Sequence, residues 1–281
     1  MEMLLANPEI DINYCISWAN HNWEDTWKAS AGNEKILIGH DFDDEDDWVA
    51  HFKYMLPFFK DERYIKEENK PLLTIYIPNI IGKLNKMLAL WKQMALDEGF
   101  DGLKYAFQSA MSYNAKGWDR SMFDYSIEFQ PGFINFKKSI SNYLNLMKYS
   151  HKIKRVLGLK IRLQRPQKEL TVKDYDKTWM KILKNKPSDS NSIPSAFVDW
   201  DNTPRKKQAG IVYKGATPAK FKYYFKQLLL KTKEEYKTDK IFVFAWNEWA
   251  EGGYLEPDEK YGYSYLNAIK ESLIECDEIE N

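Results

Sequence analysis

The stretch IFVFAWNEWAEGGYLEP, from Ile241 to Pro257, decides how the rest of the chain is interpreted. It begins with a run of apolar and aromatic residues, which is typical of a buried β-strand, and then becomes polar at Asn247 and Glu248. A second glutamate, Glu251, follows three positions later. Parallel β/α barrels carry their active sites at the carboxyl ends of their strands. The stretch therefore predicts an interior strand that ends in a chemically active loop.

Five other apolar segments share this form, and stretches with helical periodicity lie between most of the six. We expect the six strands within Ile12–Asn20, Pro71–Pro78, Phe100–Phe107, Phe123–Pro131, Ser195–Asn202 and Lys240–Trp249. Their alternation with helices predicts an α/β fold, and the polar ends of the strands favour a (β/α)8 barrel of the TIM type. No internal repeat or linker is evident, so we expect one domain over residues 1–281.

Local signals indicate several other elements. Apolar residues recur at helical spacing over Leu84–Ala95, and Thr217 has the form of an N-cap followed by proline at the first helical position. The acidic stretch Asp41–Trp48 lacks the central glycine of a calcium loop and predicts the first turn of a helix. Residues 151–170 fit either a strand or a helix, and residues 185–195 are expected to form a loop.

Composition excludes several classes of protein. Basic and acidic residues balance at 41 each, so the sequence has no overall basic character of the kind that nucleic-acid binders show. The two cysteines, Cys15 and Cys276, lack metal-ligand spacing, which favours reduced thiols and a cytoplasmic location. No segment approaches the roughly 18 apolar residues of a membrane span. We therefore expect a cytoplasmic protein with no nucleic-acid partner, no membrane span, no cofactor and no metal.

The spacing of Glu248 and Glu251 suits acid–base chemistry. Side chains three positions apart on a helical turn share one face, with Cβ atoms about 5 to 6 Å apart. In such a pair, mutual repulsion and partial burial raise the pKa of one carboxyl group, which leaves a proton donor beside a base, as in glycoside hydrolysis. Both are candidate catalytic residues, although this common spacing also fits a cap or a salt bridge. No histidine is near enough to favour a metal site.

Aromatic residues make up 15% of the chain, and many stand beside Asn, Asp or Glu. This suits sugars, whose C–H faces stack on rings while their hydroxyl groups need hydrogen-bond partners, although an aromatic-rich core has the same composition. Two further strand ends, SWANHNW and DWDNTPR, have this form and supply candidate substrate-binding residues: Trp18, Asn20, Asn22, Trp23, Trp200, Asp201, Asn202 and Arg205. The Asn and Asp residues among them equally fit simple turns.

The segments WANHNW, LPFFKDERYI, KPLLTIYIP, EFQP, WDNTPR and AWNEWAEGGYLEPD, followed by YGYSYL, resemble in this order the WbsX-like family of bacterial surface-polysaccharide proteins. That family is similar to the family-99 glycoside hydrolases, the endo-α-mannosidases. The resemblance covers about Pro8 to Ile269 and implies a (β/α)8 barrel and an oligosaccharide or polysaccharide substrate. It adds further residues to the candidate substrate-binding set: Tyr76, Gln130, Trp246, Asn247, Trp249 and Glu256.

The resemblance also implies roles for the two glutamates. In the hydrolases, an NEW-x-E segment after the last strand supplies both catalytic carboxylates. By this similarity Glu248 is the base that helps the sugar 2-hydroxyl attack its own anomeric carbon, and Glu251 is the acid that protonates the leaving oxygen. Family members are often labelled glycosyltransferases, so both hydrolysis and transfer are open.

The chain departs from the family pattern in two places. His21 stands where the family usually has an acidic residue. The family also begins with two strands before the WAN strand, so the resemblance implies that this chain holds strands three to eight of the barrel and needs an upstream extension or a separate N-terminal fragment. Our first hypothesis is an enzyme that cleaves or forms a glycosidic bond in O-antigen or capsule biosynthesis. The second is a non-catalytic carbohydrate-binding or fragmentary relative.

Overall fold

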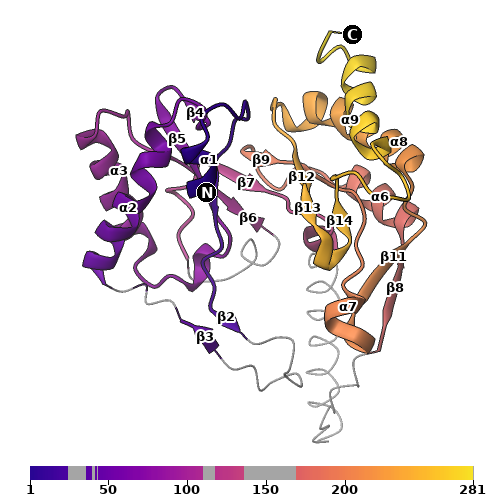
Figure 1. Cartoon of the computed structure of the whole chain (residues 1–281), viewed down its shortest axis with the longest axis horizontal. Helices are drawn as coiled ribbons and strands as arrows, with labels where there is room; N and C mark the ends of the chain where they lie inside the picture. Colours follow the sequence, from indigo (N-terminus) through magenta and orange to yellow (C-terminus); the bar gives the residue numbers. More distant parts are fainter. Residues whose placement is uncertain (25–35, 40–41, 43, 110–117, 136–168, 281) are drawn as a thin grey trace, which may run out of the picture. The chain divides into compact units, whose positions relative to one another are not determined.

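The computed structural model describes residues 1–24, 36–39, 42, 44–109, 118–135 and 169–280. The chain divides into two compact units, Met1–Ile127 and Glu128–Asn281. Both units combine helices with parallel strands (Figure 1), which confirms the predicted α/β class. Closure of the strands into a barrel stays a prediction.

Four of the predicted strands form the parallel sheet of the first unit. In spatial order they are β1 (Ile16–Trp18), β5 (Lys70–Ile75), β6 (Lys104–Gln108) and β7 (Tyr125–Ile127). The register sets Leu73 of β5 between Ile16 and Tyr105. Two antiparallel ribbons accompany this sheet, formed by β4 (Lys66–Glu67) with β5 and by β2 (Trp23–Glu24) with β3 (Ile36–Ile38).

The helices of the first unit are α1 (Glu2–Ala6), α2 (Glu45–Lys60), the 3-10 turn η1 (Pro78–Ile80) and α3 (Leu84–Asp97). Helix α2 begins with three acidic residues, and the side chain of its N-cap Asp44 accepts a hydrogen bond from the Asp46 amide, which confirms the predicted acidic first turn. Helices α2 and α3 lie side by side (Figure 1), and Trp91 Nε1 donates to the Trp48 carbonyl oxygen at 2.8 Å. The apolar core of this unit therefore forms around fully buried Trp91.

The second unit contains the other two predicted strands. Strand β10 (Ser195–Phe197) pairs in parallel with β12 (Phe242–Phe244), and both are shorter than the apolar runs suggested. A separate parallel pair consists of β8 (Thr171–Asp174) and β11 (Ile211–Lys214). The expected loop at residues 185–195 contains a short strand, β9 (Ser192–Ile193). Most of residues 151–170, which fitted either element, lie outside the described residues.

The helices of the second unit are α6 (Tyr175–Lys184), α7 (Thr203–Lys206), the 3-10 turn η2 (Lys207–Ala209), α8 (Pro218–Lys231), the π-helical turn η3 (Thr232–Tyr236) and α9 (Ser264–Glu275). Thr217 caps α8 as predicted, because its hydroxyl accepts from the Lys220 amide. The core centres on the buried indole of Trp179, which stacks with Phe197 and Tyr224 at ring-centroid distances of 5.5 and 5.6 Å.

Glu128 forms a buried polar hub in the second unit. Its side chain is almost fully buried and accepts hydrogen bonds from the Ser188 amide and hydroxyl, Asn185 Nδ2 and the Tyr236 hydroxyl at 2.7 to 3.2 Å. Buried carboxylates are costly unless such donors compensate their lost hydration. The hub therefore ties the loop after α6 to the end of η3.

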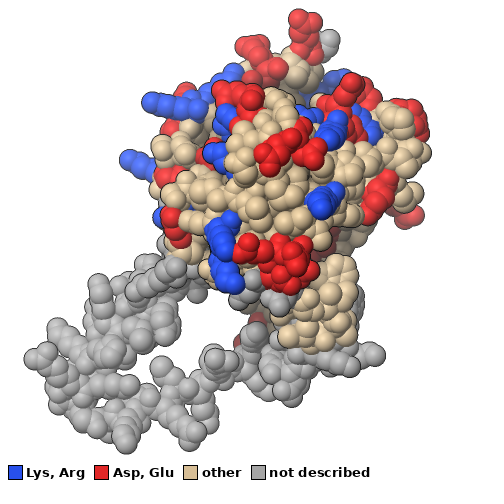
Figure 2. Space-filling view, turned by 90° about the vertical axis from the view of Figure 1, so that its left-hand side faces the viewer, with Lys and Arg blue, Asp and Glu red and all other residues tan. Residues whose placement is uncertain are grey.

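The described residues contain no candidate membrane-spanning helix, and positive and negative side chains are mixed on the surface. Within the residues that the structure covers, no helix is both long and apolar enough to cross a bilayer. On the face drawn in Figure 2, the described Lys and Arg side chains are interspersed with Asp and Glu side chains. This mixture agrees with the balanced composition of the sequence.

Candidate functional site

The segment after β12 folds into a tight hairpin. Strands β13 (Asn247–Glu248) and β14 (Gly253–Tyr254) pair antiparallel, and the 3-10 turn η4 (Trp249–Glu251) connects them. Glu248 is the N-cap of this turn and Glu251 is its last residue. Because a 3-10 helix has three residues per turn, side chains at positions i and i+3 eclipse one another. The two glutamates thus stand at the two ends of one short turn.

Two glycines permit the hairpin. Gly252 has φ +66°, a left-handed conformation that side chains rarely adopt, and a Cβ there would lie 3.1 Å from the Asp201 amide nitrogen. At Gly253, a Cβ would overlap the ring of Phe244. Both positions therefore bring the backbone of the hairpin against the end of β12 and the segment after β10.

Glu251 is held from two sides. Its carbonyl oxygen accepts from the Asp201 amide at 2.7 Å, and its carboxylate forms an ion pair with the Arg205 guanidinium. The Glu251 side chain is 13% exposed, and an arginine partner favours the charged form of such a carboxylate. Arg205 Nε is also buried, and it has no hydrogen-bond partner among the described residues.

The two polar residues before Arg205 in DWDNTPR both bond to the backbone. Asp201 Oδ1 accepts from the Thr203 amide at 2.9 Å, and Asn202 Oδ1 accepts from the Ile211 amide at 2.7 Å. The first bond closes a turn at the start of α7, and the second ties Asn202 to the start of β11. Arg205 lies on α7 and contacts Glu251 of the hairpin from there.

Glu248 has a different environment from its partner. It is half-buried, and within the described part of the chain no hydrogen bond or ion pair engages its carboxylate. One glutamate is therefore paired with a cation, while the other has no such partner among the described residues. Carboxylates in unequal environments are what an acid–base pair requires.

Two exposed tryptophans flank the glutamates. Trp246 and Trp249 are 54% and 49% exposed. Trp249 stacks on Tyr254 at a centroid distance of 3.7 Å, and its Nε1 donates to the Glu256 carboxylate at 2.5 Å. These contacts fix the orientation of the indole while half of its surface stays exposed, which suits stacking against a sugar ring.

Asp199 is a residue that the sequence interpretation missed. It is half-buried after β10, and its Oδ1 accepts from the Trp200 amide at 2.7 Å. Burial raises the pKa of Asp199 to about 6, and the nearby charge of Asp201 acts in the same direction. The signal available in the sequence was the DWD triplet, in which two acids bracket a tryptophan at a strand end.

A second group of predicted residues belongs to the first unit. Trp18 packs edge-on against His51 at 4.6 Å and lines a pocket of about 350 Å3. Asn20 is fully buried, because its amide accepts from the Ile77 nitrogen at 2.7 Å and donates to the Ile77 oxygen at 2.8 Å. The Tyr76 amide donates to the Trp18 carbonyl oxygen, so these residues form one local cluster.

The remaining predicted residues differ in accessibility. Trp23 on β2 is 61% exposed, Asn22 is half-buried, and His21 is exposed with its ring 5.5 Å from that of Tyr76. Gln130, in the second unit, is buried: its side-chain Oε1 accepts from the Ile134 backbone amide, and its backbone amide donates to the Ser195 hydroxyl oxygen. The amide group of Gln130, like those of Asn20 and Asn202, is therefore engaged with the backbone.

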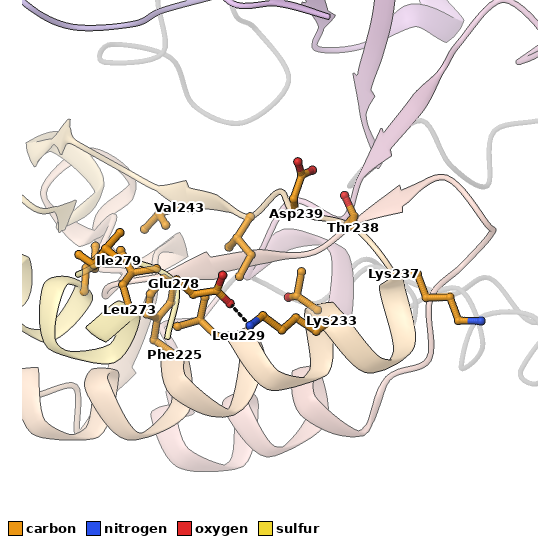
Figure 3. A pocket seen from close by; sticks show the side chains of 13 residues that line it. Phe225, Leu229, Lys233, Lys237, Thr238, Asp239, Val243, Leu273, Glu278 and Ile279 are labelled. Carbon is orange, nitrogen blue, oxygen red and sulfur yellow. Dashed lines mark ion pairs between the residues drawn. The ribbon is translucent and has the colours of Figure 1, made fainter. Parts of the chain in front are cut away.

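A larger cavity lies elsewhere in the second unit. It has a volume of about 660 Å3, and Figure 3 shows the Lys233–Glu278 ion pair, 2.7 Å long, among its lining side chains. Most of its apolar lining comes from α8, α9 and the strand segment around β12: Phe225, Leu229, Ile241, Val243, Ile269 and Leu273. Neither Glu248 nor Glu251 lines it, so this cavity is separate from the hairpin site.

Residues 1–269 match the family described as Glycosyltransferase WbsX. The chain belongs to this family. The match extends over the hairpin and both groups of predicted residues in this WbsX-family chain.

Curated relatives of this WbsX-family chain occur in two strains of Xanthomonas campestris pv. campestris, where each is called uncharacterized protein WxcX. Each is 24% identical over 283 residues, a stretch that covers 98% of this chain and 36% of the relative. The chain thus spans about a third of the length of these relatives. No solved structure matches it significantly.

Proposed function

We propose that this chain is a carbohydrate-active enzyme of polysaccharide biosynthesis in which Glu248 and Glu251 cleave or form a glycosidic bond. The observation that carries the proposal is the hairpin, which holds two glutamates in unequal environments at the ends of one turn and carries exposed Trp246 and Trp249. Membership of the WbsX family supports the carbohydrate substrate. The parallel pairing within each unit supports a (β/α)8 barrel as the scaffold.

The proposed reaction has two steps. Glu248 removes the proton of the sugar 2-hydroxyl, whose oxygen attacks the anomeric carbon as the bond to the leaving oxygen breaks, and Glu251 gives its proton to that oxygen. A hydroxyl group then opens the resulting three-membered ring at the anomeric carbon. Its proton passes to Glu251, and Glu248 returns its proton to the sugar. Water as the acceptor gives hydrolysis, whereas a sugar hydroxyl gives transfer.

The ion pair with Arg205 sets a condition on this reaction. Glu251 must enter the first step protonated, but its contact with Arg205 favours the charged form. We propose that a bound glycan draws the Arg205 guanidinium away from Glu251. Arg205 Nε, which has no hydrogen-bond partner among the described residues, supplies a donor for the glycan. The same ion pair favours the second candidate function, a non-catalytic carbohydrate-binding protein in which Glu251 only anchors the hairpin.

We assign the other predicted residues according to their environment. Trp246, Asn247 and Trp249 would contact the sugar because all three are exposed. Trp200, Glu256, Trp18, Asn22, Trp23 and Tyr76 stay proposed contacts, whereas Asn20, Gln130, Asp201 and Asn202 would act by holding the backbone in place.

The experiment compares Glu248→Gln and Glu251→Gln with the parent protein and with a control, Glu259→Gln, which changes an exposed glutamate of the following loop. Product release from bacterial surface polysaccharide and from aryl glycosides measures turnover, and calorimetry measures glycan binding. Loss of an acid or base should lower the rate by about a hundredfold to ten-thousandfold with binding retained. Near-normal rates in both variants would refute the catalytic assignment. Binding without turnover in the parent protein would establish the second candidate.

A further inference from the structure

The ion pair between Arg205 and Glu251 restricts which glycans can activate the proposed acid. The guanidinium donates from its terminal Nη2 to Oε1 of Glu251. Among the described residues, Glu251 is the one acidic side chain that forms an ion pair with Arg205. The Arg205 and Glu251 side chains are 30% and 13% exposed, so solvent screens this pair only in part. A substrate that separates the two groups must therefore replace Glu251 as the partner of a partly buried cation.

The contact with Glu251 uses only half of a two-pronged donor. In a guanidinium group, the N–H bonds of Nε and Nη2 lie on one edge, and their fork matches two oxygens of a carboxylate or phosphate group. Arg205 Nη2 donates to Glu251, whereas Nε is enclosed by the protein and has no hydrogen-bond partner in the described part of the chain. A buried donor of this kind is uncommon and requires an explanation. This edge of Arg205 therefore holds its present partner by fewer hydrogen bonds than it can form.

A neutral hydroxyl group would be a poor replacement for Glu251. It would accept a hydrogen bond from Arg205 but leave the positive charge without a counter-ion, and taking one partner from a buried ion pair is strongly destabilising. An anionic substituent keeps the charges paired and can accept from both Nε and Nη2. The exchange thus favours a substrate that carries its own negative charge.

We propose that the substrate is an acidic glycan, whose carboxylate or phosphate substituent takes the place of Glu251 on Arg205. The released Glu251 carboxylate takes up one proton from solvent and becomes the acid of the first reaction step. The substituent itself does not react, and its bonds stay intact. The inference rests on the proposed function, since it names a substrate class and an activation step for the same pair of glutamates.

The surroundings of a released Glu251 favour its protonated form. The side chain is largely buried, and Glu248 stands at the other end of the same turn as a group of like charge. The other charged residues of the adjoining segments are Asp199 and Asp201 before α7, Lys206 within α7 and Glu256 after the hairpin. Lys206 is exposed, and the other three are acidic. Loss of the Arg205 contact would therefore remove the main influence that keeps Glu251 charged.

The first test compares the affinities of acidic and neutral sugars. The acidic probes are the methyl glycosides of glucuronic, galacturonic and mannuronic acid and methyl glucoside 6-phosphate, and the neutral probes are methyl glucoside, galactoside and mannoside. In titrations followed by tryptophan fluorescence and saturation-transfer NMR, at least one acidic glycoside should bind about tenfold more tightly than its neutral parent. Arg205→Gln should abolish this preference, and Arg205→Lys, which keeps the charge, should retain part of it. Lys206→Gln, which removes the neighbouring exposed charge of α7, is the matched control and should retain all of it.

The second test measures the proton that Glu251 takes up. Calorimetry in buffers of different ionisation enthalpy follows hexuronoside binding between about pH 5 and 7, where these ligands are already ionised. Net uptake of up to about one proton per bound hexuronoside is expected. Glu251→Gln should abolish the uptake and tighten the binding of acidic glycosides, because no carboxylate then competes for Arg205. Glu248→Gln should keep both the uptake and the preference.

Equal binding of acidic and neutral glycosides, or no binding of either, would overturn the inference, as would a preference that survives Arg205→Gln in a folded protein. Binding of hexuronosides without proton uptake, or uptake that survives Glu251→Gln, would also overturn it. So would inorganic phosphate that binds as tightly as the acidic glycosides, because the site would then recognise an anion and no sugar. A tighter complex with the hexuronosides or with the 6-phosphate identifies the substituent, and either result supports the inference.

The two proposals fail in different ways. Turnover of a neutral glycan, with no preference for acidic ones, would refute the exchange at Arg205 and leave the catalytic assignment intact. Acidic preference and proton uptake without turnover of any glycan would refute the catalytic assignment and leave the exchange intact.

Discussion

Replacing Asp199 with asparagine should stabilise the second unit at neutral pH and leave its stability at about pH 3 unchanged. Burial raises the pKa of this carboxyl group from 3.8 to about 6, so the folded state holds the proton more tightly than the unfolded state. Stability therefore falls as pH rises between these two values and stays low above them. Asparagine removes the charge, and its Oδ1 can still accept from the Trp200 amide.

The expected magnitude follows from the size of the shift. One pKa unit corresponds to about 1.4 kcal/mol, so the full shift is worth about 3 kcal/mol. Because Asp199 is only half-buried and solvent screens its charge, we expect a gain of about 1 to 3 kcal/mol in the free energy of unfolding. The gain should grow from zero at about pH 3 to a plateau above about pH 6.5.

Urea denaturation of the parent and Asp199→Asn proteins at several pH values measures this difference. Asp101→Asn, which changes an exposed aspartate of the first unit, serves as the control and should give no comparable pH-dependent gain. A difference that does not depend on pH would refute the argument from burial. A loss of stability at neutral pH would show that attraction between Asp199 and Lys260, which opposes the shift, outweighs the cost of burial.

Two further substitutions test the backbone contacts of the proposed site. Gly253→Ala should lower the free energy of unfolding by about 2 to 3 kcal/mol, because the new methyl group overlaps an aromatic ring. Gly262→Ala, where no atom lies within 4 Å of the new methyl group, should cost about 1 kcal/mol. Equal losses of stability in thermal melting would contradict the close approach of the Gly253 backbone to that ring. Asn20→Leu should cost about 2 to 4 kcal/mol by leaving both backbone groups of Ile77 buried and unpaired. The control Asn85→Leu removes a hydrogen bond between surface side chains. Equal destabilisation by both variants would show that the two hydrogen bonds between Asn20 and Ile77 are not formed.

The elements that could be predicted from the sequence are those governed by local patterns. The apolar run from Ile241 indicated β12, and the Thr217 cap indicated the start of α8, because burial and capping leave signals within a few residues. The predicted strands were longer than the observed ones, because the apolar residues continue beyond the last backbone hydrogen bond that pairs each strand with its neighbour. The β13–β14 hairpin was not predicted, because two adjacent glycines indicate a turn without specifying which backbone they approach.

The candidate site was predictable in its residue types and less so in its contacts. Glu248 and Glu251 were found by their spacing, but the partner of Glu251 is Arg205, 46 positions earlier in the chain, and no local pattern reveals such a pair. Burial is equally invisible in the sequence. Asn20 looked like a sugar ligand and is engaged with the backbone, while Asp199, which was not among the candidate residues, has a raised pKa.

The hub at Glu128 has a consequence for local unfolding. Its donors come from the loop after α6 and from η3, two segments about 50 residues apart in the chain. If either segment detaches, the carboxylate loses part of its compensation while it is still surrounded by protein, so opening one segment weakens the attachment of the other. The two should therefore open as one cooperative unit and show similar protection in amide hydrogen exchange. A single buried carboxylate thus couples the opening of two segments that are distant in the sequence.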